Sequence, residues 1–317
     1  MLQQNTQQEK RRGRPKGVTP TVAQKLLIAL ALVDYATRDQ LARLLDMERS
    51  CTYIRETLSG LTAAGFVLCL VGSGVTMPHV YTLTRKGREY ATRLLGTPTA
   101  KRFRPAEERD KARNEFFLKH TLAVTDVLIA AQLLNQTTPG ITLNRIYTER
   151  ALRRKISVTL DSTLHSRTIY VEPDASLDFL LTETWHEKPE TWQDFVHIEV
   201  YRTLPPAQWH FKQKIQGYVT YATLGQHEAL FHTPALSIAV FAATEPMAGT
   251  LKCWTEEALA ELKRPDEGDM FFFDSVDVAN ASPEEMYLTR VWKQAFRDAT
   301  VPLLVLAEEH EEVRTNQ

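Results

Sequence analysis

Residues 37–66, TRDQLARLLDMERSCTYIRETLSGLTAAGF, decide the fold of the first quarter of the chain. Thr37, followed three residues later by Gln40, has the spacing of a capping box and predicts that a short helix begins there. Apolar side chains recur at helical spacing within residues 50–64 and predict a further helix, one face of which is made of Ile54, Leu58 and Leu61. Gly65 is the residue type expected just after the end of that helix.

The sequence on either side of this stretch completes a predicted domain over residues 20–95. An apolar helix precedes it, and two strands (66–71 and 79–84) and a closing helix (85–95) follow it. This order of three helices, a β-hairpin and a helix resembles the winged-helix domains of bacterial regulators. The pieces that carry the resemblance are QLARLL at 40–45, LSGLTAAGF at 58–66 and YTLTRKG at 81–87.

The polar face of the helix at 50–64 predicts contact with DNA. Its hydroxyl, phenol and guanidinium groups can donate hydrogen bonds to phosphates and to base edges in a major groove. These groups belong to Ser50, Thr52, Tyr53 and Arg55. Basic residues just after the hairpin are expected to contact the DNA backbone, namely Arg85, Lys86 and Arg88. The alternative is a winged helix that serves only protein contact.

Residues 1–19 are polar, without periodicity, and are expected to be disordered. They contain Arg12, Gly13, Arg14, Pro15 and Lys16, a run that resembles an AT-hook. In such a hook the glycine fits the floor of a narrow A·T minor groove, and the arginines lie where its negative potential is strongest. The resemblance implies binding to A·T-rich double-stranded DNA. The alternative is an unspecific basic tail that adds affinity through counterion release.

The net charge of −1 hides an asymmetry along the chain. Residues 1–104 contain 17 Lys and Arg against 7 Asp and Glu, a net charge of +10, and the remainder carries −11. A basic first part favours a nucleic-acid partner, and the acidic part is expected to have another task. The three cysteines show no pairing pattern, and no run of 18 apolar residues occurs, so we expect a cytoplasmic protein without a membrane partner.

Residues 96–110 contain two prolines, a glycine and many charges, which predicts a linker. A second domain is expected over 111–306 and a charged tail over 307–317. Helix and strand patterns alternate in the second domain, which predicts an α/β fold there and an α+β chain overall. The expected helices lie at 111–134, 208–224 and 249–262, and the expected strands at 141–149, 175–181, 195–201, 236–243 and 270–274. Residues 150–168 are expected to be irregular, and residues 182–191 to form a charged loop.

Two acidic residues of the second domain have the arrangement of a metal site. Asp174 follows a proline at the start of a strand, and Glu199 lies on the next strand, 25 residues later. This resembles the PD-(D/E)xK nuclease pattern, in which two carboxylates hold Mg²⁺ or Mn²⁺ and a lysine orients the attacking water. Tyr201 stands where that lysine is expected, so Lys214 or Lys212 would replace it from the following helix. The alternative is that Asp174 is a turn or cap residue and that Glu199 pairs with a lysine beneath the helix.

The whole layout resembles the replication-relaxation (MobC-like) proteins of plasmids and mobile elements. The resemblance covers most of residues 20–245 and is carried by HTLAVTDV at 120–127, EPDA at 172–175, HIEVYRT at 197–203 and KIQGY at 214–218. In that family the third block usually reads EVDRGT, so Tyr201 takes the place of an aspartate. The resemblance implies a winged helix, a restriction-endonuclease-like second domain and a role in plasmid replication, relaxation or mobilisation.

Three hypotheses follow. The leading one is a DNA-binding accessory protein whose nuclease-like domain is non-catalytic, requires no cofactor, and contacts a partner protein or a second copy. The second is a metal-dependent endonuclease that uses Asp174, Glu199 and Lys214 with Mg²⁺ or Mn²⁺, and Glu115 as a further ligand. The third is a transcriptional regulator whose second domain senses a ligand or a partner.

Overall fold

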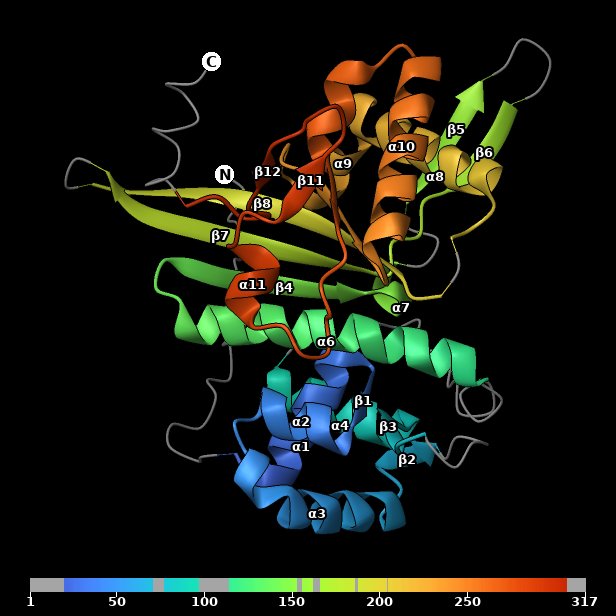
Figure 1. Ribbon diagram of the computed structural model, residues 1–317. Helices are drawn as coiled ribbons and strands as arrows, with labels where there is room; N and C mark the ends of the chain where they lie inside the picture. Colours follow the sequence, from blue (N-terminus) through green and yellow to red (C-terminus); the bar gives the residue numbers. More distant parts are fainter. Residues whose placement is uncertain are drawn as a thin grey trace, which may run out of the picture.

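The chain is mixed α/β, as predicted. The computed structural model describes residues 20–70, 77–96, 114–152, 156–161, 166–185, 188–203 and 205–306 (Figure 1). We call residues 20–96 the N-terminal unit and residues 114–306 the sheet unit. The AT-hook-like motif, nearly all of the predicted linker and the charged tail after residue 306 lie outside the described residues.

The N-terminal unit has the predicted order of helices and hairpin strands, with one further strand. Its elements are α1 (Val22–Val33), β1 (Tyr35–Thr37), α2 (Arg38–Leu44), the 3-10 helix η1 (Glu48–Ser50), α3 (Cys51–Ala63), β2 (Val67–Leu70), β3 (Val80–Leu83) and α4 (Arg85–Leu95). The further strand, β1, pairs antiparallel with β3, and the sheet order is β1-β3-β2. A strand of three residues is too short to produce a recognisable sequence pattern.

Local sequence signals set the helix limits in this unit. The Gln40 N–H donates to Thr37 Oγ1 (3.1 Å) and the Thr37 N–H donates to Gln40 Oε1 (3.0 Å), which confirms the predicted capping box. The apolar face of α3 is buried, with Ile54 and Leu58 at 0% exposure. Gly65 has a φ of +71°, which glycine adopts without steric penalty, and it follows the end of α3 as predicted.

The sheet unit is built on one mixed sheet. Its elements are α6 (Glu115–Thr137), β4 (Ile141–Thr148), α7 (Glu149–Leu152), β5 (Ser157–Asp161), β6 (Ser166–Tyr170), β7 (Ala175–Trp185), β8 (Lys188–Tyr201), α8 (Gln208–Thr223), α9 (Gln226–Phe231), β9 (Ser237–Ala242), α10 (Glu245–Glu261), η2 (Pro265–Met270), β10 (Phe271–Asp274), α11 (Pro283–Tyr287), β11 (Trp292–Gln294) and β12 (Thr300–Val301). The seven-stranded sheet has the order β12-β11-β10-β9-β8-β7-β4, and β5 and β6 form a separate hairpin. β9 pairs parallel with both β8 and β10, and the other neighbours in this sheet pair antiparallel.

Helices cover both faces of the sheet, so successive residues of the central strand β8 enter different cores. α6 lies along one face, and α8 and α10 lie on the other (Figure 1). Val196, Ile198 and Val200 belong to the core on the α6 side. The alternation of a strand directs the intervening residues, Glu199 among them, to the α8 side.

The core on the α6 side continues into the N-terminal unit. α6 packs against α1, α2 and β1, and the apolar residues of these elements form one cluster with those of α6. By length and composition alone α6 could cross a membrane, but 67% of its most apolar window is buried inside the molecule. A helix that is apolar nearly all round is expected where it is covered on several sides. The predicted linker gave no sign of this shared core.

Two segments differ from their predictions. Residues 150–168, expected to be irregular, contain part of α7 and most of the β5–β6 hairpin. Residues 182–191, expected to form a charged loop, continue β7 and β8 as a ribbon in which residue 182 pairs with residue 191. A two-stranded ribbon is held by backbone hydrogen bonds, so it does not need the apolar alternation by which a strand is recognised.

Candidate functional site

The outer face of α3 lies at the end of the molecule opposite the sheet unit (Figure 1). Thr52 and Arg55 are exposed, and Tyr53 is 54% exposed. Ser50, just before the helix, is half-buried. The face therefore presents hydroxyl, phenol and guanidinium groups to solvent, as the sequence predicted.

Of the three basic residues predicted after the hairpin, two lie on the surface. Arg85 forms an exposed ion pair with Glu89 (2.9 Å), and Lys86 is exposed in the first turn of α4. Arg88 instead turns inward, where its Nη2 lies 2.7 Å from Asp34 Oδ1 and its side chain is 17% exposed. We therefore leave Arg88 out of the candidate DNA contacts.

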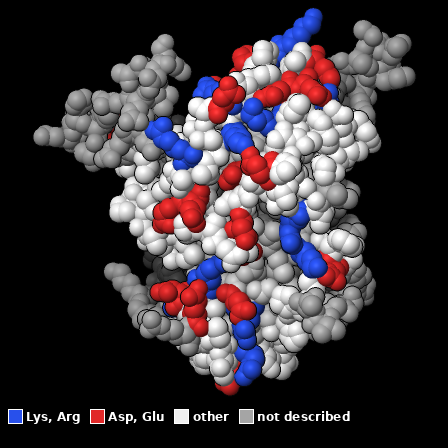
Figure 2. Space-filling view, in the orientation of Figure 1, with Lys and Arg blue, Asp and Glu red and all other residues white. Residues whose placement is uncertain are grey.

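Most of the net positive charge of the first part of the chain lies outside residues 20–96. Residues 20–96 contain nine Lys and Arg and six Asp and Glu, which accounts for +3 of the +10 of residues 1–104. Figure 2 shows basic and acidic side chains interspersed over the face it presents, without a continuous basic stripe among its described residues. The larger part of the net positive charge therefore belongs to residues 1–19 and 97–104.

Asp174 and Glu199, predicted as a pair, lie on adjoining parts of β7 and β8. Asp174 immediately precedes β7, and its backbone N–H donates to a carbonyl of β8 (3.0 Å). Its side-chain oxygens have different partners. Oδ1 lies 3.1 Å from His120 Nε2 on α6, and Oδ2 accepts the Val200 N–H (2.8 Å).

Glu199 contacts α8 on the opposite face of the sheet. Lys214 Nζ forms an ion pair with Glu199 Oε2, and Tyr218 Oη donates to Oε1. Of the two lysines predicted to replace the missing one, Lys214 reaches the glutamate. Glu199 is 3% exposed, whereas the Lys214 side chain is 27% exposed. We call Asp174, Glu199, Lys214, His120 and Tyr218 the carboxylate cluster.

The pKa values of the two carboxyl groups shift in different net directions. Burial alone would raise the pKa of Asp174, but hydrogen bonding and charge from His120, with Lys214, lower it overall. Burial raises the pKa of Glu199 to about 7, opposed by Lys214 and assisted by the negative charge of Asp174. Lys214 stays charged, because Glu199 raises its pKa despite burial.

The other candidates for this site lie elsewhere. Lys212 pairs with Glu257 (2.8 Å) and with Glu261 on α10, away from Glu199. Glu115, weighed as a further metal ligand, pairs with Lys119 one turn along α6 (2.5 Å). The structure therefore assigns neither residue to the carboxylate cluster.

The carboxylate cluster does not fit a divalent metal as it is arranged. Mg²⁺ and Mn²⁺ need carboxylate oxygens that can turn toward the ion. All four side-chain oxygens of Asp174 and Glu199 already face a protein donor or cation, and one of these cations is the ammonium group of Lys214. Among the described residues, no group of three or more His, Cys, Asp or Glu side chains is arranged to hold a metal ion.

His197, two residues before Glu199 on β8, belongs to a neighbouring aromatic cluster. Its Nδ1 lies 2.6 Å from Ser176 Oγ, and its ring centroid lies 6.0 Å from that of His227. Burial, assisted by His227, lowers the pKa of His197 well below its usual value. His197 is therefore a neutral, packed residue at physiological pH.

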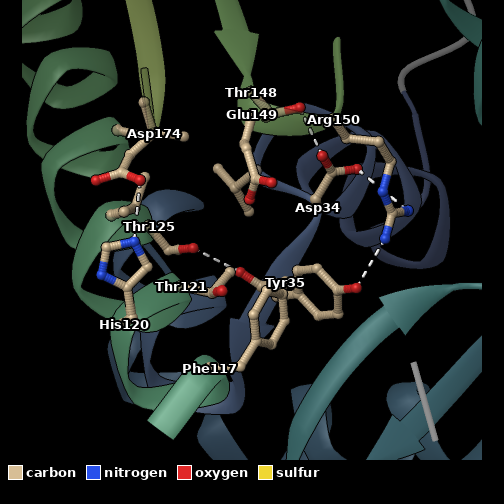
Figure 3. Close-up of a pocket in the computed structure, with 13 residues that line it drawn as sticks. Asp34, Tyr35, Phe117, His120, Thr121, Thr125, Thr148, Glu149, Arg150 and Asp174 are labelled. Carbon is tan, nitrogen blue, oxygen red and sulfur yellow. Dashed lines mark hydrogen bonds and ion pairs between the residues drawn. The ribbon is translucent and has the colours of Figure 1, made fainter. Parts of the chain in front are cut away.

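A cavity of about 60 Å³ lies where the N-terminal unit meets the sheet unit (Figure 3). Asp34 and Tyr35 line it from the N-terminal unit, and Arg150 lines it from α7. His120 and Asp174 lie together at its opposite side. The carboxylate cluster therefore adjoins the N-terminal unit through Asp174.

The sequence patterns did not assign a role to three residues of these sites. His120 and Tyr218 lie inside the blocks 120–127 and 214–218 that carry the family resemblance, and this was the signal that could have found them. Asp34 stands alone between two elements, and no motif or spacing marks it.

A family model described as Replication-relaxation matches residues 27–233, about two thirds of the chain. This span runs from α1 past α9 and includes every residue of the carboxylate cluster. No curated protein and no solved structure matches the chain.

Proposed function

Because the chain belongs to the replication-relaxation family, we propose that it binds double-stranded DNA and acts in the replication or relaxation of a plasmid or another mobile element. In this proposal the N-terminal unit is a winged helix, with α3 in the major groove and the β2–β3 hairpin as the wing. The sheet unit is a nuclease-like domain without catalytic activity that contacts a partner protein or a second copy.

The observation that carries the proposal is the division of α3 into two faces. One face is packed into the core through Ile54 and Leu58, and the other carries Thr52, Tyr53 and Arg55 to solvent at the end of the molecule. Hydroxyl and guanidinium groups on an exposed helix are suited to phosphates and base edges. If the N-terminal unit served only protein contact, DNA affinity would not depend on these polar groups.

Gly60 gives the proposal independent support. It is exposed within α3, and a Cβ placed on it would meet no atom within 4 Å. A glycine inside a helix costs about 0.5–1 kcal/mol relative to alanine. Packing within the described chain does not require a glycine at this position. A DNA backbone that passes close to α3 would require one, because it would leave no room for a side chain.

The direct test is the affinity of the full chain for a fluorescent duplex, measured by anisotropy at several salt concentrations. We expect Arg55→Ala to weaken binding by about 5- to 100-fold, as for loss of one base or phosphate contact. Arg297→Ala is the matched control, since Arg297 is a partly exposed arginine of the sheet unit paired with Asp269. Equal affinities of the two variants would contradict a DNA-contacting α3.

The basic tail is tested with a variant that lacks residues 1–19. If the AT-hook-like run binds in the minor groove, affinity for A·T-rich duplexes falls more than affinity for G·C-rich duplexes. An equal fall in affinity for both duplexes would leave the tail only an unspecific electrostatic role. The variant without the tail would then show a shallower salt dependence of binding than the full chain. Unchanged binding would exclude any contribution of this tail.

Gly60→Ala separates stability from binding. The substitution should stabilise α3 by about 0.5–1 kcal/mol, because alanine is the better helix former. It should also weaken DNA binding, because the added methyl group occupies the space assigned to DNA. A stabilised variant with unchanged affinity would place the duplex away from this part of α3.

The proximity of Glu199 and Lys214 near Asp174 favours a second candidate function, metal-dependent DNA cleavage. The engagement of all four carboxylate oxygens argues against it. The test is conversion of supercoiled plasmid to nicked or linear form with Mg²⁺ or Mn²⁺. Cleavage that Asp174→Ala abolishes would establish a nuclease, and gel retardation without cleavage would support the non-catalytic domain.

A further inference from the structure

We propose that Asp34 is a positioning residue that holds the N-terminal unit in a fixed orientation against the end of the sheet where Asp174 lies. The functional consequence rests on the proposed DNA binding. DNA bound on α3 would be held in a fixed orientation relative to the carboxylate cluster.

The backbone of Asp34 is in a conformation that L-residues rarely adopt. Its φ and ψ are +65° and −48°, and its N–H donates to Leu30 O at the end of α1 (3.1 Å). Such a conformation costs energy and persists only where the surroundings determine it. The α1–β1 turn is therefore held by contacts of Asp34 beyond its own helix.

Those contacts come from both units. Asp34 Oδ1 accepts from Arg88 Nη2 of α4 (2.7 Å), and Oδ2 accepts from Thr148 Oγ1 at the end of β4 (2.6 Å). Arg150 Nη1 lies 3.8 Å from Oδ1. Asp34 therefore joins an arginine of its own unit to two residues of the sheet unit. Asp34 is 5% exposed, and the side chains of Arg88 and Arg150 are 17% and 24% exposed.

The same residues lead directly to Asp174. Glu149 follows Thr148, and its N–H donates to Asp174 O (3.0 Å). Arg150 Nη2 donates to the hydroxyl group of Tyr35, the residue after Asp34 (2.7 Å). Figure 3 shows these groups around the junction cavity, with Asp34 and Asp174 on opposite sides.

A second polar contact between the units lies on α6. Asp126 accepts from Gln40 Nε2 (2.8 Å) and forms an ion pair with Arg43, both on α2. Together with the apolar core that α6 shares with the N-terminal unit, these polar contacts hold the unit in one orientation. Thr125 Oγ1 of α6 also donates to Tyr35 O (2.7 Å), and Asp34 supplies the attachment to β4 and α7 across the cavity.

Hydrogen exchange of the full-length protein tests the inference. Asp34→Asn removes the charge, and Thr148→Val removes only the hydroxyl bond across the junction at nearly constant volume. Both variants should speed amide exchange in residues 146–152 and 174–176 by about tenfold, as for loss of one buried hydrogen bond. Thr92→Val is the control, because it removes a hydroxyl bond that lies within α4, from Thr92 to Arg88 O, and does not cross the junction.

The location of the faster exchange decides the outcome. Acceleration confined to residues 30–38 and 85–92 would make Asp34 a local structural residue and would overturn the inference. Affinity for a short duplex, measured in parallel, should be unchanged in Thr148→Val because the DNA-contacting face is intact. If the unmodified chain binds no DNA, the proposed function fails, while the exchange result still decides the role of Asp34.

Discussion

Asp34 and Glu199 are both buried acidic residues next to cationic side chains, yet the protein shifts their pKa values in opposite directions. The pKa of Asp34 is lowered, although burial alone would raise it. The pKa of Glu199 is raised to about 7. Exposure does not explain the difference, since the two residues are 5% and 3% exposed.

The number and sign of the neighbouring charges explain it. Asp34 is near the guanidinium groups of Arg88 and Arg150 and accepts a hydroxyl bond from Thr148. Glu199 has one ammonium group, that of Lys214, and the negative charge of Asp174 acts against its ionisation. A buried carboxylate is stabilised only where the surrounding positive charge exceeds the cost of desolvation. The junction between the units meets this condition better than the carboxylate cluster does.

The largest effect is expected for Asp34→Ala. It leaves Arg88 and Arg150 partly buried without their carboxylate, and unfolding in urea should show a loss of about 3–5 kcal/mol. Glu89→Ala is the control, because the exposed pair of Glu89 with Arg85 contributes no more than about 1 kcal/mol. Equal losses in the two variants would show that the two buried arginines find other partners and that the junction is not held by Asp34.

The next largest effect is expected in the pH dependence of stability of Glu199→Gln. Between its ordinary pKa of 4.5 and its folded pKa of about 7, the folded chain binds a proton that the unfolded chain has lost. The contribution of Glu199 to stability is therefore complete below pH 4.5 and is lost as pH rises through 7. In the unmodified chain the free energy of unfolding in urea should fall by on the order of 3 kcal/mol across that pH range. Glu199→Gln should not show this fall.

Asp34 should show the reverse dependence. Its contribution is present above its ordinary pKa of 3.8 and is lost as pH falls through its lower folded value. Identical pH profiles for Glu199→Gln and the unmodified chain between pH 4.5 and 7 would contradict the contrast between the two carboxylates.

A smaller effect is expected for Tyr218→Phe. The substitution keeps the ring and removes only the hydroxyl group that donates to Glu199. The free energy of unfolding at pH 8 should therefore fall by about 2 kcal/mol. The pKa of Glu199 should rise further, which moves the midpoint of the pH-dependent decline upward. Tyr53→Phe, on the exposed face of α3, is the control and should leave both stability and midpoint unchanged.

The smallest effect, about 1 kcal/mol, is expected for Arg88→Lys. Lysine keeps the positive charge near Asp34 but cannot reproduce the planar geometry of the guanidinium group. Chemical denaturation should therefore place this variant between the unmodified chain and Asp34→Ala. A loss as large as that of Asp34→Ala would mean that geometry, rather than charge, stabilises the junction.

The elements of the candidate sites could be predicted where neighbours in sequence act on one another. The spacing of Thr37 and Gln40 marked the start of α2, and the period of Ile54 and Leu58 identified the two faces of α3. Tyr201 in place of the expected lysine led to the prediction that Lys214 or Lys212 of the following helix replaces it, and of these two Lys214 reaches Glu199. Arg88 was misjudged, because its basic neighbours Arg85 and Lys86 are exposed and its inward partner is distant in sequence.

By itself, the sequence determined the helices and central strands, the two faces of α3 and the family resemblance, because these depend on residue types at short, regular spacings. Only the tertiary structure decided that the N-terminal unit packs on α6 through a shared core. It also decided that Asp34, Arg88 and Arg150 meet at one junction beside Asp174. Contacts between residues so far apart depend on how whole elements pack, and a buried charge has no partner until packing supplies one.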